Sequence, residues 1–140
     1  MPLAAKQRLV VAALVVLAAW PLAHRALVAR YGLDPWRFFG WAMYCTPKLP
    51  VRVALRERRA GAVSEIALRD LPRPARRAAS RLKKGRALWG TLASPAGLAA
   101  ALGASRPDAE GFEIVVERWF LDPATAHIGT RRDVYEYPVQ

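Results

Sequence analysis

Few of the residue types that bind metals or act as nucleophiles occur in this chain of 140 residues. It has two histidines, His24 and His127, and one cysteine, Cys45. A metal site needs several ligands close together, and a nucleophile needs a base within hydrogen-bonding reach. The histidines stand far apart, and no Ser or Cys motif accompanies His127. We therefore expect no metal and no cofactor, and a membrane-tethered enzyme using Cys45 or His127 is only our third hypothesis.

Two carboxylates, Glu113 and Glu117, have a spacing that places them on one face of a predicted strand. Paired carboxylates can divide the roles of acid and base. The same spacing is typical of the solvent side of a half-buried strand, where Arg131 or Arg132 could form cross-strand ion pairs. We favour this structural interpretation. The stretch 84–90 also lacks the pattern of a phosphate-binding loop.

Cations are concentrated between Arg69 and Arg86. This stretch contains eight Lys and Arg residues and one acidic residue, Asp70, so it contributes +7 to the total net charge of +11. Such a patch attracts anionic lipid headgroups, an acidic protein surface or nucleic acid. It is equally typical of a solvated helix face. Nucleic acid is the least favoured partner, because no nucleic-acid-binding module is recognisable. The candidate anion-binding residues are Arg73, Arg76, Arg77, Arg81, Lys83, Lys84 and Arg86.

The amino-terminal part of the chain has no charged residue between Arg8 and Arg25, and positions 9–23 are apolar throughout. About 20 apolar residues in a helix cross the roughly 30 Å of bilayer hydrocarbon. We predict a cytoplasmic amino terminus over 1–8 and a transmembrane anchor over 9–30. A cleaved signal peptide is the alternative, but bulky side chains disrupt its cleavage site.

Polar and aromatic side chains follow the apolar run. His24, Arg25 and Arg30 lie in the last turns of the predicted span, where they would reach the headgroups or face a partner. Positions 31–48 form an aromatic segment, and Asp34 before Pro35 predicts a short helix that begins there and lies along the membrane surface. Alternatively, these rings belong to the core of the following domain. The candidate interface residues of this segment are Trp36, Phe38, Phe39, Trp41 and Tyr44.

Charge on the two flanks of the span favours one orientation. The amino flank carries the terminal amine, Lys6 and Arg8, whereas Asp34 offsets one of the two arginines on the carboxyl flank. The more positive flank of a span usually stays in the cytoplasm. With a composition rich in Ala, Arg and Pro, this predicts a bacterial inner membrane protein with an extracytoplasmic carboxyl-terminal domain. The lone Cys45 cannot form an internal disulfide, and we interpret it as a small buried hydrophobe, with lipidation or an intermolecular disulfide as alternatives.

Positions 49–140 are predicted to form one domain of the α+β class, with an antiparallel sheet packed on two helices in the order β-β-α-α-β-β. Period-two alternation predicts strands over 51–56 and 63–68, joined by a turn at Gly61, and a longer strand over 112–121. A turn over 122–125 leads to a returning strand over 126–137, with a bulge at Gly129. The intervening helices are predicted from Leu71 to about Gly85, with a thin apolar stripe of Ala75, Ala78, Ala79 and Leu82, and over 87–103. Within the second, Ser94 is the predicted N-cap of the final segment and Pro95 its first helical residue. The pattern does not determine the strand order.

Two hypotheses for the function stand ahead of the enzyme. The first is a single-pass accessory protein, a small subunit or assembly factor that docks on an integral-membrane partner through its span and aromatic segment. The second is a tethered extracytoplasmic domain that binds an anionic ligand or an acidic partner through the basic helix.

Overall fold

The computed structural model of the chain describes residues 2–35, 50–122 and 125–139. The predicted interfacial helix and Cys45 lie outside the described residues. So do two residues of the predicted turn over 122–125. The candidate interface residues Trp36, Phe38, Phe39, Trp41 and Tyr44 lie outside them as well.

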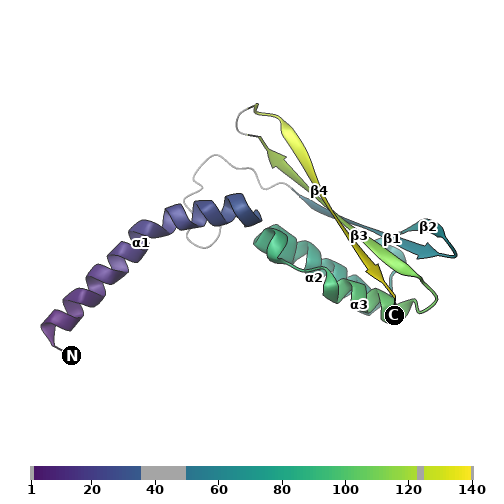
Figure 1. Ribbon diagram of the computed structural model, residues 1–140, viewed down its shortest axis with the longest axis horizontal. Helices are drawn as coiled ribbons and strands as arrows, with labels where there is room; N and C mark the ends of the chain where they lie inside the picture. Colours follow the sequence, from purple (N-terminus) through teal and green to yellow (C-terminus); the bar gives the residue numbers. More distant parts are fainter. Residues whose placement is uncertain (1, 36–49, 123–124, 140) are drawn as a thin grey trace.

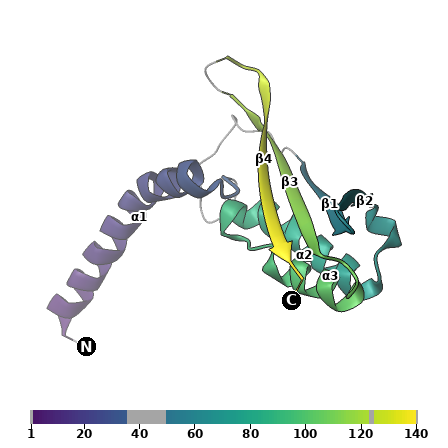
Figure 2. The same cartoon turned by 45° about the vertical axis from the view of Figure 1, so that its right-hand side comes forward.

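The apolar amino-terminal run lies in one long helix, α1 (Leu3–Tyr31). Its 29 residues give a length of about 43 Å at about 1.5 Å per residue. Its most apolar window has a mean hydropathy of 1.8 and is almost entirely uncovered by the protein. By length and composition, α1 is therefore able to cross a membrane. The helix bends along its length (Figures 1 and 2), and Pro21, which removes one backbone hydrogen bond, lies inside it.

The carboxyl-terminal part is built on a four-stranded antiparallel sheet. The strands are β1 (Val51–Arg59), β2 (Ala62–Ile66), β3 (Gly111–Leu121) and β4 (Ile128–Pro138), in the spatial order β2-β1-β3-β4. Two hairpins therefore meet where β1 pairs with β3 (Figure 1). This confirms the predicted α+β class with an antiparallel sheet. The first hairpin turns at Ala60 and Gly61, which both have positive φ, as a tight turn of this kind requires.

Two helices connect the hairpins and cover one face of the sheet (Figure 2). They are α2 (Arg73–Trp89) and α3 (Ala96–Ser105), each preceded by a single 3₁₀ turn, η1 (Leu68–Asp70) and η2 (Gly90–Leu92). The predicted end of the first helix near Gly85 is wrong, because Gly85 continues the helix and Gly90 caps it. The predicted start of the second helix at position 87 is wrong for the same reason. The final segment of this predicted helix begins at Ala96, one residue after the start predicted at Ser94 and Pro95, and the backbone N–H of Ala96 donates to Ser94 Oγ.

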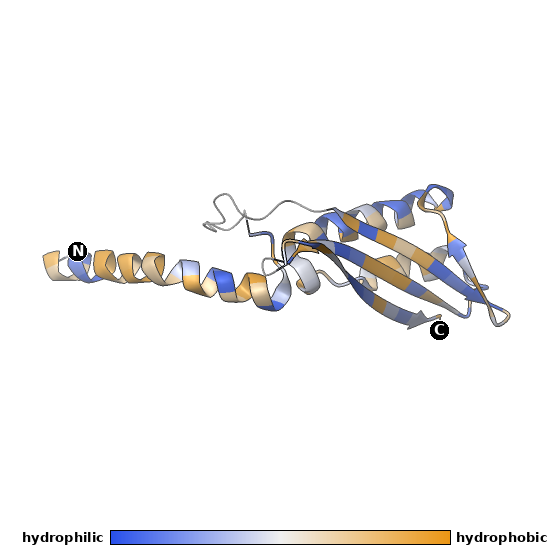
Figure 3. Cartoon of the chain, turned by 90° about the horizontal axis from the view of Figure 1, so that it is seen from above, coloured by the Kyte–Doolittle hydropathy of each residue, from blue (hydrophilic) through white to orange (hydrophobic). Residues whose placement is uncertain are grey.

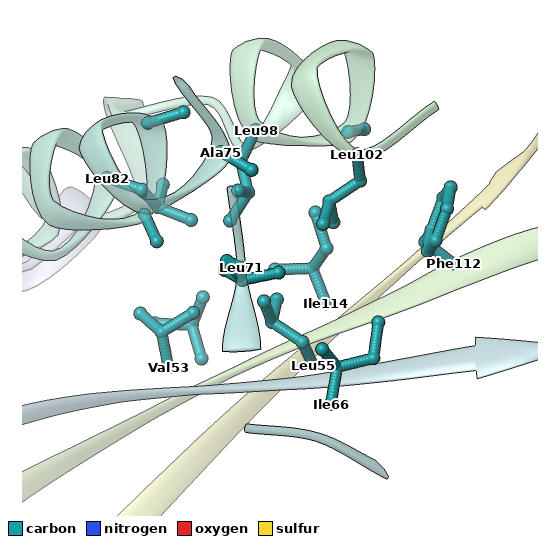
Figure 4. Close-up of a cluster of buried hydrophobic side chains, with 14 of the residues drawn as sticks. Val53, Leu55, Ile66, Leu71, Ala75, Leu82, Leu98, Leu102, Phe112 and Ile114 are labelled. Carbon is teal, nitrogen blue, oxygen red and sulfur yellow. The ribbon is translucent and has the colours of Figure 1, made fainter. Parts of the chain in front are cut away.

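The core lies between the helices and the sheet. Figure 4 shows Leu82, Leu98 and Leu102 of the helices facing Leu55 and Ile114 of the strands. Alternating hydropathy along the strands (Figure 3) separates this face from the outer one. The side of α2 that packs on the sheet carries small residues at helical spacing, which lets the helix approach closely. They are Ala75, Ala78 and Ala79.

Strand β4 is regular, and the predicted bulge at Gly129 is wrong. Its pairing with β3 runs without interruption from Leu121 opposite Ile128 to Gly111 opposite Pro138. Gly129 lies opposite Phe120, whose ring lies over it, so that a Cβ atom at Gly129 would be 2.6 Å from Phe120 Cζ. The glycine therefore provides room for an aromatic ring on the neighbouring strand rather than an extra residue.

Candidate functional site

The basic face of α2 consists of the exposed cations Arg73, Arg76, Arg77, Arg81, Lys83 and Lys84. At 3.6 residues per turn, Arg73, Arg77 and Lys84 point directly away from the buried stripe. Arg76 donates to the carbonyl oxygens of Arg69 and Leu71 at 3.2 and 2.9 Å. The other five form no hydrogen bond or ion pair with the described part of the chain.

Arg86 was predicted in the anion-binding set, and the structure places it elsewhere. Its side chain is 1% exposed and lies on the buried stripe of α2, eleven residues after Ala75. It therefore cannot contact a ligand at the surface of the basic face. The helical phase explains the difference, because position 86 falls on the apolar side whatever the charge of the residues around it.

The partners of Arg86 come from β4. Its Nη1 atom lies 3.6 Å from Asp133 Oδ2, its Nη2 atom donates a hydrogen bond to the Tyr135 hydroxyl, and its guanidinium carbon is 4.9 Å from the centre of the Tyr135 ring. Asp133 also pairs with Arg131, at 3.5 Å. A buried guanidinium is tolerated only where such partners replace water.

A second guanidinium, that of Arg118 on β3, lies close to the same carboxylate. Burial lowers the pKa of Arg118, the nearby positive charges of Arg131 and Arg86 lower it further, and Asp133 opposes them. One carboxylate therefore lies close to two guanidinium groups, that of the buried Arg86 and that of the half-buried Arg118. Arg118 Nη1 also donates a hydrogen bond to Gly32 O, 3.0 Å away, in the residue that caps α1. We call Arg86, Arg118, Asp133 and Tyr135 the buried charge cluster.

This bond is one of several that fasten the end of α1 to the domain. Thr91 Oγ1 donates to Tyr31 O at 3.2 Å, and the backbone N–H of Asp34 donates to Leu88 O at 3.0 Å. Gly32 has φ +64°, ψ +40° and caps α1 in the left-handed conformation. We call this contact the joint; it is made of Tyr31–Asp34 on one side and Leu88, Gly90, Thr91 and Arg118 on the other.

Gly90 determines how closely the two sides of the joint approach. It has φ +56° and ψ −130°, a conformation that is essentially restricted to glycine. A Cβ atom there would overlap Tyr31 O and lie 2.5 Å from Gly32 O. The carbonyl end of α1 therefore packs directly against the Gly90 backbone, and the domain is attached to α1 by a fixed contact.

The three polar candidates on α1 have different surroundings. His24 is 4% exposed, its ring centre is 6.0 Å from that of Trp20, and its Nε2 atom has no hydrogen-bond partner among the described residues. Arg25 is exposed. Arg30 is also exposed, with its guanidinium carbon 5.9 Å from the centre of the Tyr31 ring. The structure does not bring these three together into one site.

The carboxylates that could have acted as an acid–base pair are ion-paired on the outer face of the sheet. Arg56 Nη1 lies 3.0 Å from Glu113 Oε1, and Arg132 Nη2 lies 3.4 Å from Glu117 Oε1. The second pair was predicted, whereas Arg131 lies on the opposite face with Asp133. The described residues contain no group of His, Cys, Asp and Glu side chains that could hold a metal ion.

A second buried ionic contact lies at the far end of the sheet and was missed in the sequence. Glu57 is 4% exposed, and its two carboxylate oxygens accept hydrogen bonds from Arg106 at 2.6 Å and Arg59 at 3.2 Å. The signal was available, because Glu57 follows Val53 and Leu55 on the inward phase of β1. Its role is to tie the end of α3 to the sheet.

Comparisons with known proteins add no assignment: no family model matches the chain, and neither a curated protein nor a solved structure is significantly similar to it.

Proposed function

We propose that this protein is a single-pass membrane accessory protein, a small subunit or assembly factor of a larger integral-membrane complex. In this proposal α1 anchors it in a bacterial inner membrane with the domain on the extracytoplasmic side. The observation that carries the proposal is the joint, where Arg118 and Thr91 bond to the last carbonyls of α1 and Gly90 packs against them. A domain that is merely tethered needs only a flexible linker, whereas a subunit must present its domain in one orientation.

Polar residues near the predicted span support docking on another membrane protein. Ionisable side chains inside a membrane are costly and usually face protein or a water-filled cavity. Arg25 is exposed on α1, next to the buried His24. A neighbouring helix with a carboxylate or carbonyl group would supply the missing acceptor for Arg25. The candidates Trp36, Phe38, Phe39, Trp41 and Tyr44 would extend this interface at the membrane surface.

A second candidate function is the binding of an anionic ligand or an acidic partner through the basic face. The observation in its favour is that none of the exposed cations Arg73, Arg77, Arg81, Lys83 and Lys84 forms an ion pair with a described acidic side chain. Cations that are not neutralised within the protein remain available to an anion.

Co-purification of the full chain tests the first function. The tagged protein, extracted from its native membrane in a mild detergent, is expected to bring down an integral-membrane partner in a fixed ratio. Replacing Arg25 by Leu should reduce partner recovery about tenfold, because a buried charge interaction is worth more than about 1.4 kcal/mol. The matched control is Leu22→Val, a nearby exposed apolar position, which should leave recovery unchanged. Isolation of the chain alone under these conditions, or its release from membranes by alkaline carbonate, would contradict the proposal.

A further inference from the structure

We infer that the basic face of α2 lies on an anionic phospholipid surface, so that the domain rests on the membrane that α1 crosses. This inference rests on the proposed function in one respect, namely that α1 spans a bilayer. It goes further by naming the occupant of the basic face and the side of the domain that meets lipid.

The first argument is the distribution of charge over the domain. The basic face carries six exposed cations, and α2 contains no acidic residue. The outer face of the sheet is balanced, because the strand register places four arginines and four glutamates there. They are Arg52, Arg56, Arg58, Arg132, Glu65, Glu113, Glu117 and Glu136. Of the two sides of the domain formed by described residues, the basic face is therefore the one that attracts a negatively charged surface.

The second argument is the position of the helical layer relative to α1. The joint attaches α1 to the end of α2 and to η2, through Leu88, Gly90 and Thr91. In Figures 1 and 2, α2 and α3 lie on the side of the sheet toward which the bent α1 descends to its amino terminus. If this amino-terminal part crosses the bilayer, the helical layer is turned toward the lipid and the outer face of the sheet is turned away.

The third argument concerns the range of the interaction. Attraction between cations and anionic headgroups falls off within a Debye length, about 10 Å at 0.1 M salt. A flexible linker would let the domain leave this layer, whereas the joint holds α2 close to the end of the span. Arginine and lysine on one continuous helix face also match a surface of many headgroups better than a single small anion, which needs a concave site.

Fluorescence quenching in reconstituted bilayers tests the inference with the full chain. A dye is attached at Ser80→Cys, on the exposed side of α2, after the native Cys45 has been replaced by serine. The bilayers contain lipids with a nitroxide on the headgroup and either phosphatidylcholine alone or phosphatidylcholine mixed with phosphatidylglycerol. Quenching at position 80 is expected to be roughly twofold or more stronger with phosphatidylglycerol, and to fall as salt rises to about 1 M. A dye at Glu65→Cys, on the outer face of the sheet, should be quenched equally in both.

Charge variants separate this electrostatic contact from simple proximity. The double variant Arg77→Gln with Lys84→Gln should remove most of the gain in quenching, whereas Arg52→Gln with Arg58→Gln, which removes the same charge from the outer face, should not. Equal quenching at position 80 in both bilayers overturns the inference. The inference is also overturned if quenching at position 80 stays weak with phosphatidylglycerol while the same dye is shielded from water in native membranes. In that case a protein, and not lipid, covers the basic face. Carbonate extraction of the chain is a different outcome and overturns the proposed function itself.

Discussion

Replacing Gly90 by alanine is expected to destabilise the domain by about 3 kcal/mol or more and to detach it from the end of α1. The backbone conformation of Gly90 is strained for any residue with a side chain, and its Cβ atom would overlap Tyr31 O. The overlap is removed only if the end of α1 moves away from Gly90. This movement breaks the hydrogen bonds from Thr91 to Tyr31 O and from Arg118 to Gly32 O. Denaturant unfolding of the full chain in detergent micelles measures the loss.

A second readout distinguishes detachment from general instability. Protease cleavage between Tyr31 and Pro35 should accelerate in Gly90→Ala under conditions where the domain is still folded. The matched control is Gly103→Ala, a helical glycine of α3 with no atom within 4 Å of the added Cβ. It should stabilise the domain by about 0.5–1 kcal/mol, because it reduces the freedom of the unfolded chain. If the two alanine variants behave alike, the joint does not restrict α1.

Replacing Asp133 by asparagine should cost about 3–5 kcal/mol, because it leaves the buried Arg86 and the half-buried Arg118 without this counter-charge. Arg86 is almost fully inaccessible, and burial already lowers the pKa of Arg118. The protein is unable to release this cost by deprotonation at ordinary pH, since arginine stays charged. Thermal or denaturant unfolding of the full chain provides the measurement.

Two comparisons attribute this effect to buried charge. Glu117→Gln breaks an ion pair with Arg132, which is half exposed, and should cost less than about 1 kcal/mol. The double variant Asp133→Asn with Arg86→Met removes one buried cation together with the carboxylate, and should recover part of the lost stability. A double variant as unstable as Asp133→Asn alone would show that Asp133 acts through its shape or hydrogen bonds instead.

Much of the fold was predictable because it follows local periodicity. The alternation over 51–56 and 112–121 identified β1 and β3, and the spacing of Ala75, Ala79 and Leu82 identified the buried side of α2. The strand order was not predictable, because pairing of β1 with β3 depends on contacts between residues some 60 positions apart. The choice of Gly90 rather than Gly85 as the helix cap depends on the same kind of contact, in this case with α1.

The buried charge cluster shows where sequence interpretation was too dependent on residue type. Arg86 was grouped with its cationic neighbours, although its helical phase places it with Ala75 and Leu82. Arg118 likewise follows Ile114 and Val116 on the inward phase of β3. The phase of each element was enough to place both side chains on the inward side, but Arg86 was assigned by its charge and Arg118 was given no role. Their pairing with Asp133 could not be derived, because it requires the register of β4 against β3.

The joint also has a mechanical consequence. A helix that is clamped to its domain acts as a lever, so that a change in the tilt of α1 swings the whole domain with it. Local thinning or thickening of a bilayer changes the tilt of the helices that cross it. If α1 crosses a bilayer, as proposed, a change in its tilt would be transmitted through the joint to the far end of the sheet, where Glu57 and Arg106 lie.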